Sequence, residues 1–218
     1  MGSFKYQPGN PSVVSALGRL RRRIVIQEIA LAARVVEFSD LITRCEVTQR
    51  DGSALFLEAG MEDLWRRLNQ LRNDGGHLYV IGNGGSAAVA SHAVTDFFNV
   101  AKLRATTLHE SSLMTCMSND FGYENALGRM VKQLVNAGDV VIAISSSGKS
   151  MNIRNAVTEA TIAGGYVVTF SGFAQDNPLR FLGDLNLWIN STDYGLVEVG
   201  HQFLLHNLSD RFGVGLVG

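Results

Sequence analysis

The sequence predicts an α/β fold, in which a doubly wound five-stranded parallel sheet follows an N-terminal helical arm. Three observations carry this prediction. From Gly76 onward, short apolar runs alternate with longer polar–apolar segments, which indicates alternating strands and helices. Those short runs are almost continuously apolar, as in parallel strands that are buried on both faces. Before this point the apolar residues recur at helical spacing.

The N-terminal third is predicted to be helical. Residues 12–48 contain no proline, and their apolar residues recur every three or four positions. A second helix is expected near residues 60–72, where leucines share one face. We therefore expect residues 1–72 to form a helical arm that packs on the core and on neighbouring subunits. Residues 73–218 are expected to form the main domain.

The main domain is predicted to contain five strands and four helices. The strands are expected at residues 77–81, 105–108, 139–145, 166–170 and 185–189. The helices are expected at about residues 86–98, 125–135, 150–163 and 195–210. Ligands of such sheets bind at the carboxyl ends of the strands, so the turns that leave the strands are where chemistry is expected.

Composition excludes several classes of protein. The 218 residues carry 19 Lys+Arg against 20 Asp+Glu, and 46% are apolar, which excludes a disordered chain. This charge balance argues against nucleic acid as a direct partner, because such binding depends on basic residues. No apolar run reaches the roughly 20 residues of a membrane helix. The two cysteines, Cys45 and Cys116, lie far apart and predict a reducing, cytoplasmic setting.

Two turns after predicted strands are rich in glycine and serine, as phosphate-binding loops are. The first reads Gly-Asn-Gly-Gly-Ser at 82–86, and the second reads Ser-Ser-Ser-Gly-Lys-Ser at 145–150. Small residues let the backbone approach a ligand, and the helix that follows offers free N–H groups and a positive dipole end. Tight turns with ordinary helix caps remain the alternative. The candidate phosphate-binding residues are Asn83, Gly84, Gly85, Ser86, Ser145, Ser146, Ser147 and Ser150.

Each loop also comes close to a nucleotide-binding motif. Gly82 and Gly84, with Ala87, fit part of the dinucleotide pattern, but a lone match of this kind is weak. The second loop resembles a Walker A loop, yet Ala143 stands where that motif needs its first glycine. Both nucleotide-binding motifs are therefore incomplete in this chain.

The two loops together resemble the SIS (sugar isomerase) domain family, and within it the phosphoheptose isomerases. The family reads GNGGS, then a helix with a histidine and an acid, an NDFG segment, a second serine loop and a final helix ending in His-x4-His. This chain shows the same order over roughly residues 60–210. The matching residues are Gly82–Ser86, His92, Asp96, Asn119–Tyr123, Ser145–Ser150, His201 and His206.

The resemblance implies an SIS fold and the isomerisation of sedoheptulose 7-phosphate to glycero-manno-heptose 7-phosphate. It implies that Asp96 is the catalytic base, that His206 is the acid, and that Asp120 contacts the sugar hydroxyls. It also implies that the serine loops bind the phosphate. A homotetramer with active sites at subunit contacts is expected. Relatives can hold zinc, and the matching ligands here are His92, Asp96, Glu198 and His206.

The chain departs from the family at several of these positions. Asp96 replaces a glutamate, Glu198 replaces a glutamine, and Lys149 replaces an asparagine. Glu198 and His206 are eight residues apart, about 12 Å along a regular helix, so a shared metal would need an irregular helix or a neighbouring subunit. The alternative function is a non-catalytic SIS protein that binds a phosphosugar or a replication-initiator protein.

Overall fold

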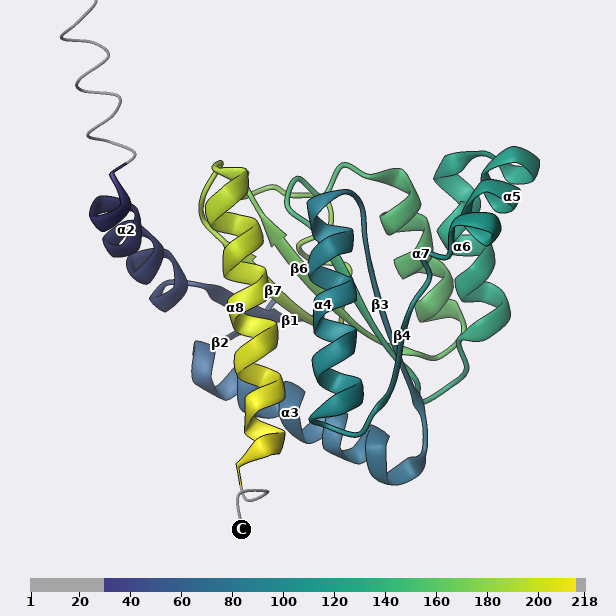
Figure 1. The fold of residues 1–218 in the computed structure, drawn as a ribbon, viewed down its shortest axis with the longest axis horizontal. Coiled ribbons are helices and arrows are strands. Elements are labelled where there is room, and N and C mark those ends of the chain that lie inside the picture. Colours follow the sequence, from purple (N-terminus) through teal and green to yellow (C-terminus); the bar gives the residue numbers. More distant parts are fainter. Residues whose placement is uncertain (1–29, 215–218) are drawn as a thin grey trace, which may run out of the picture. The chain divides into compact units, whose positions relative to one another are not determined.

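The computed structural model describes residues 30–214 and contains one seven-stranded sheet of order β2-β1-β7-β6-β5-β3-β4 (Figure 1). The five predicted strands are present and pair in parallel. Their bounds are His77–Gly82 (β3), Arg104–Thr107 (β4), Val140–Ser145 (β5), Tyr166–Gly172 (β6) and Leu185–Ile189 (β7). The predicted α/β fold with a parallel five-stranded core is therefore confirmed.

Helices cover both faces of the sheet, as a doubly wound fold requires. One layer holds α3 (Leu57–Asp74), α4 (Gly85–Asn99) and α8 (Tyr194–Gly213), and the other holds α5 (Ser111–Phe121), α6 (Tyr123–Leu134) and α7 (Met151–Ile162) (Figure 1). The strand β5 is buried along its whole length. Its Val141 and Ala143 face the cluster formed with α6 and α7, and the intervening residues face the opposite layer.

Two short strands were not predicted. The sequence predicted helix through residue 48, but the helix α2 (Leu31–Thr43) ends earlier and β1 (Glu46–Gln49) follows it. The β-branched pair Val47-Thr48 favours a strand, and Asp51-Gly52 forms the turn to β2 (Ala54–Leu55). That prediction was wrong for these residues because the Asp-Gly turn signal outweighs the upstream periodicity. The part of the predicted helix at residues 12–29 lies outside the described residues.

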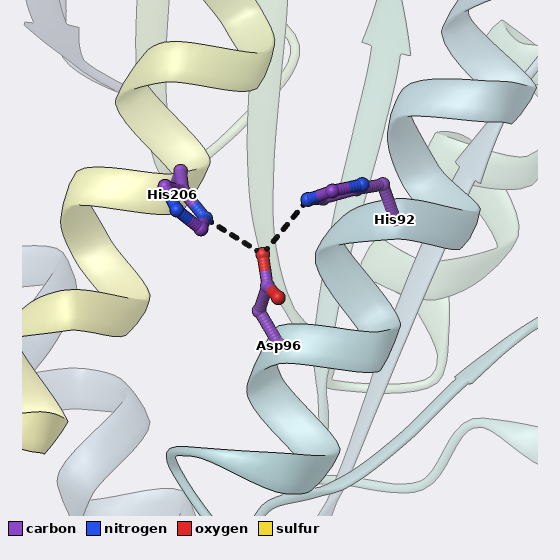
Figure 2. A group of neighbouring side chains, drawn as sticks. All are labelled: His92, Asp96 and His206. Atoms are coloured by element: carbon purple, nitrogen blue, oxygen red, sulfur yellow. Dashed lines mark hydrogen bonds and ion pairs between the residues drawn. The ribbon is translucent and has the colours of Figure 1, made fainter.

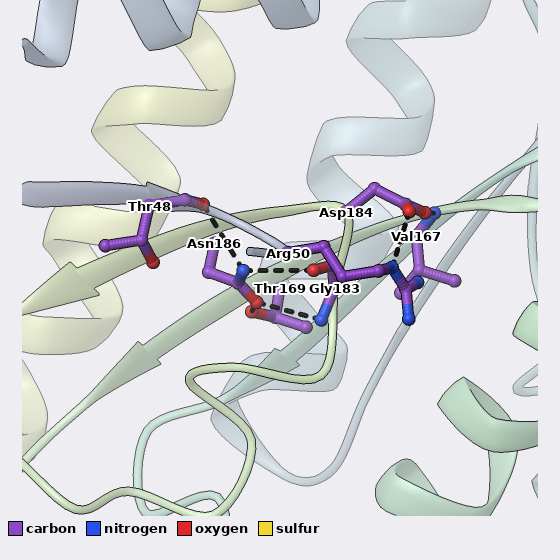
Figure 3. A network of polar contacts seen from close by, with 7 residues as sticks. All are labelled: Thr48, Arg50, Val167, Thr169, Gly183, Asp184 and Asn186. Atoms are coloured by element: carbon purple, nitrogen blue, oxygen red, sulfur yellow. Dashed lines mark hydrogen bonds and ion pairs between the residues drawn. The ribbon is translucent and has the colours of Figure 1, made fainter. Parts of the chain in front are cut away.

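A polar network, which is buried around Asn186 and exposed at Arg50, joins β1 to the parallel strands (Figure 3). The Asn186 amide donates to the Thr48 carbonyl (3.3 Å), and its oxygen accepts from the Thr169 hydroxyl (2.7 Å). Next to it, Asp184 accepts a hydrogen bond from the Arg50 side chain (2.8 Å). Buried polar groups are costly unless they are paired, so these contacts fix the register of β1 against β7. The network consists of Thr48, Arg50, Val167, Thr169, Gly183, Asp184 and Asn186.

The helix α5 was also not predicted. Glu110 forms its N-cap and accepts hydrogen bonds from the backbone N–H groups of Ser112 (3.1 Å) and Leu113 (2.8 Å). The predicted helices near 60–72, 86–98, 125–135, 150–163 and 195–210 correspond to α3, α4, α6, α7 and α8. Within residues 30–214, none of the helices has the length and apolarity that crossing a membrane requires.

Candidate functional site

A pocket of about 260 Å³ lies at the carboxyl ends of β3 and β5. These strands are neighbours in the sheet, and Gly82 pairs with Ile144, so the two glycine- and serine-rich loops leave the sheet side by side. The structure thus brings together every residue predicted to bind phosphate from these two loops. The pocket is lined by Asn83, Gly84, Gly85, Ser86, Ile144, Ser145, Ser146, Ser147, Ser150, Tyr194 and Glu198.

The first loop needs its glycines for geometry. A Cβ at Gly82 would lie 2.6 Å from the backbone of Ser86, and Gly84 has a positive φ of 53°. The helix α4 then begins at Gly85 without a side-chain cap from the described residues. Its first N–H groups and the positive end of its dipole therefore face the pocket. Behind the loop, burial lowers the pKa of His109, whose Nε2 accepts a hydrogen bond from the Gly82 N–H (3.4 Å).

The second loop contains a buried hydroxyl that lacks a partner. Ser146 is 4% exposed, and its Oγ has no hydrogen-bond partner among residues 30–214. Buried polar atoms are normally paired, so this one needs a ligand or water. The helix α7 follows Ser150, which makes no capping bond through its side chain within the described structure. By contrast, α5 and α8 are capped by Glu110 and Asp193.

Two asparagines that were not predicted hold the loops in place. Asn152 on α7 exchanges hydrogen bonds with the Asn83 side chain (2.8 and 2.9 Å). Asn177, which is 2% exposed, donates to the carbonyls of Ser146 (2.9 Å) and Gly172 (2.7 Å). Asn152 lies two residues after the second loop, so its position is a usable signal. Asn177 lies in a long loop after β6 without any pattern that would mark it.

A second constellation lies on the paired helices α4 and α8 (Figure 2). One carboxylate oxygen of Asp96 lies 2.8 Å from Nδ1 of His206 and 3.3 Å from Nε2 of His92. Asp96 is the least exposed member at 18%, whereas His92 and His206 are more than half exposed. The hydrogen bond to Asp96 raises the pKa of His206, since it stabilises the imidazolium. Each residue offers one ligand atom, and these atoms lie within 4.8 Å of one another.

The pocket and this His/Asp cluster lie on the same two helices. Both helices begin at the pocket, because α4 starts at Gly85 and the first turns of α8 supply Tyr194 and Glu198. At 1.5 Å per residue, His92 and Asp96 lie about 10–16 Å along α4 from its start. The cluster is thus separated from the pocket by two to three helical turns.

Comparison with known proteins assigns the family. Residues 57–172 match the SIS domain. The phosphoheptose isomerase of Pelobacter propionicus is 34% identical over 156 residues, which cover 69% of this chain and 82% of that protein. The phosphoheptose isomerase of Burkholderia pseudomallei is 41% identical over 138 residues, which cover 61% of this chain and 70% of that protein. The chain belongs to the SIS domain family.

Solved structures agree with this assignment. The phosphoheptose isomerase of Neisseria gonorrhoeae superposes with a TM-score of 0.70 over 89% of this chain and 99% of its own, at 22% identity. The enzyme of Francisella tularensis gives a TM-score of 0.68 over 94% and 100%, at 20% identity. At these identities the likeness establishes that the fold is that of SIS-domain phosphoheptose isomerases.

Two predicted site residues of this SIS domain, Glu198 and Asp120, lie away from the expected partners, and Lys149 also lies outside the pocket. Glu198 lines the pocket between the two glycine- and serine-rich loops (the serine pocket). It is not a member of the His/Asp cluster in the described structure. Asp120 lies near the end of α5, exposed, where it accepts a hydrogen bond from the Asn119 side chain (2.9 Å). Lys149 is exposed and is not among the described pocket-lining residues. The regular helix α8 explains the position of Glu198, since eight residues separate it from His206.

His201, the first histidine of the His-x4-His pair, is structural. It is fully buried, and its ring Nε2–H donates to the Ser171 carbonyl (3.0 Å). Burial lowers its pKa to about 4, because a charge there would lose its hydration. The ring also packs edge-on against Phe170. His201 therefore remains neutral at physiological pH and connects α8 to β6.

Proposed function

We propose that this protein is an isomerase that converts sedoheptulose 7-phosphate to glycero-manno-heptose 7-phosphate. One observation carries the proposal beyond the relatives' names. A phosphate-type pocket and a His/Asp cluster lie on the same two helices, with a gap between them that a substrate can span. An extended seven-carbon sugar phosphate, built from bonds of ~1.5 Å, reaches on the order of 10 Å from phosphorus to C1. That length is comparable to the helical rise of about 10 Å between Gly85 and His92, and the Nε2 of His92 lies 3.3 Å from the Asp96 carboxylate.

The pocket residues hold the phosphate in this proposal. The hydroxyls of Ser86, Ser145, Ser146, Ser147 and Ser150 donate hydrogen bonds, and the open N-termini of α4 and α7 add backbone N–H groups. Asn83 is fixed by Asn152 and faces the same space. The phosphate anchors one end of the sugar, so the C1–C2 end is held at the cluster. Asp120 contacts the sugar hydroxyls in this proposal. That contact requires a shift of α5 toward the pocket, or a pocket supplied by a neighbouring subunit.

The cluster residues move the protons. Asp96 removes a proton from C1 of the ketose, which gives an enediol, exchanges that proton with solvent, and delivers a proton to C2. His206 donates a proton to the C2 carbonyl oxygen as the enediol forms, and accepts the proton of the C1 hydroxyl as the aldehyde forms. In the ligand-free protein the hydrogen bond to Asp96 raises the pKa of His206, so a larger share of the ring is protonated near neutral pH before substrate arrives. Substrate must displace His206 from Asp96 so that the carboxylate is free.

The cluster also fits a metal ion. Two imidazole nitrogens and one carboxylate oxygen form a donor set that zinc prefers, and three protein ligands leave a position open. His92, Asp96 and His206 would hold the ion, while Glu198 stays in the pocket. Bound zinc would act as a Lewis acid that polarises the substrate carbonyl. Metal analysis of the purified protein, compared with His92→Ala, tests this part of the proposal.

We further propose a cytoplasmic homotetramer in which residues 1–72 form the arm that packs on the core and on neighbouring subunits. Support comes from the exposed positions of His92 and His206, which leave room for a neighbouring subunit beside the His/Asp cluster. Sedimentation should give about four times 23.7 kDa. A stable monomer at micromolar concentration would contradict two proposals. These are the packing of the arm on neighbouring subunits and the placement of active sites at subunit contacts.

The direct test of the function is turnover of sedoheptulose 7-phosphate, followed by nuclear magnetic resonance of the aldose product. Wild type should convert the ketose, and His206→Ala should lose at least ~100-fold in turnover, the order expected for a general acid–base group. Asn207→Ala, the neighbouring position on α8, serves as the control. A wild type that binds the ketose phosphate without converting it would support the non-catalytic SIS binding protein instead.

A further inference from the structure

Glu198 is the only acidic side chain among the described residues that line the serine pocket. Its carboxylate lies against the bare Cα of Gly85, where a side chain would collide with both carboxylate oxygens. Gly85 is the first residue of α4, so the carboxylate stands at the open N-terminus of that helix. The glycine therefore makes room for an acid beside the place where an oxyanion would bind.

The other lining groups are uncharged. They are hydroxyls, an amide, backbone and an apolar side chain, and Lys149 is not among them in the described pocket. The buried Oγ of Ser146 is without a partner among residues 30–214, so the pocket retains an unused hydrogen-bonding group. A fully deprotonated oxyanion in this space would face a carboxylate with no basic side chain to offset the repulsion. An oxyanion that carries one proton would instead donate a hydrogen bond to that carboxylate.

We propose that Glu198 determines specificity by accepting a hydrogen bond from a protonated phosphate oxygen, so that the pocket selects the phosphomonoester monoanion over fully deprotonated oxyanions. The proposal rests on the proposed function, which assigns this pocket to the phosphate. A phosphomonoester loses its second proton with a pKa near ~6, so the monoanion is abundant at mildly acidic pH. Sulfate has the same shape but carries no proton there. A site built to pair with a ligand hydroxyl rejects analogues that lack it.

The experiment compares inorganic phosphate with sulfate as ligands at pH 6 and constant ionic strength. Dissociation constants are measured from ligand-induced chemical-shift changes for wild type, Glu198→Gln and Glu159→Gln. The last variant is the matched control, because Glu159 lies on α7 outside the described pocket lining. Wild type and Glu159→Gln should bind phosphate at least ~10-fold more tightly than sulfate, a lower bound for a site that pairs with a ligand hydroxyl. Glu198→Gln should reduce this ratio to below ~3-fold, mainly through tighter sulfate binding, because the repelling charge is gone.

The outcomes separate the two proposals. If Glu198→Gln keeps the wild-type ratio while all three proteins bind phosphate, the role of Glu198 is wrong and the phosphate pocket stands. If wild type binds neither anion, and the Ser86→Ala, Ser147→Ala double variant behaves identically, then both the pocket assignment and the role of Glu198 fail. Circular dichroism and thermal unfolding of each variant confirm that the fold is retained before the ratios are compared.

Discussion

At the scale of single residues, Ser146 separates a ligand-binding role from a structural one. Its buried hydroxyl has no partner in the described structure, so Ser146→Ala removes no hydrogen bond to another described residue. We expect the free energy of unfolding to stay within about 0.5 kcal/mol of wild type, or to rise. Phosphate should protect the variant less than wild type against thermal unfolding, because one phosphate donor is lost. A large loss of stability without ligand would show that the hydroxyl is structural.

His201 gives the protein a predictable dependence of stability on pH. Its pKa is about 4 in the folded protein and near 6.5 when exposed, so the unfolded chain binds more protons between these values. The free energy of unfolding is therefore highest above pH ~6.5. It falls as the pH decreases toward 4, by about 3 kcal/mol from this residue. Urea unfolding of wild type and His201→Gln across this range measures the contribution. Parallel pH profiles for the two proteins would contradict it.

At the scale of elements, the serine loop depends on Gly148. This residue has a φ of +64°, and a Cβ there would collide with the Asn177 side chain that holds the loop. We expect Gly148→Ala to destabilise the protein by about 2–3 kcal/mol, through backbone strain plus the clash, and to weaken phosphate binding. Gly138→Ala is the matched control, since Gly138 has a φ of +91° and no described atom within 4 Å of its Cβ position. Equal effects of the two changes on stability and on phosphate binding would contradict the role of Asn177 in holding the loop at Gly148.

The elements also show what the sequence could predict. Buried parallel strands such as β5 are continuous apolar runs, so their positions follow from composition alone. The strand β1 is short and is stabilised by partners far along the chain, such as Asn186, which local periodicity does not register. The helix α5 depends on its Glu110 cap, a signal of one residue. Long-range pairing and single-residue caps are the features that the pattern of apolar residues missed.

At the scale of the whole molecule, the paired helices α4 and α8 decide the layout of the site. The spacing of His92 and Asp96 placed them on one helix face, as the structure shows. The position of Glu198 could not be derived in the same way, because it depends on how far α8 is shifted along α4. With both helices starting at the pocket, Glu198 falls beside Gly85 and His206 falls beside Asp96. Within one chain, three of the four predicted metal ligands lie together in the described structure, and Glu198 lines the pocket.

We propose that Asp96 exchanges the C1 and C2 protons of a ketose phosphate whose phosphate lies in the serine pocket. The measurement that tests it most directly is deuterium incorporation from D₂O into sedoheptulose 7-phosphate and its aldose product, followed by nuclear magnetic resonance. Wild type should incorporate deuterium at these carbons, and Asp96→Asn should lose at least ~100-fold in rate while it still binds the ketose phosphate. Rapid incorporation by Asp96→Asn, or none by wild type that binds the ligand, would contradict the account.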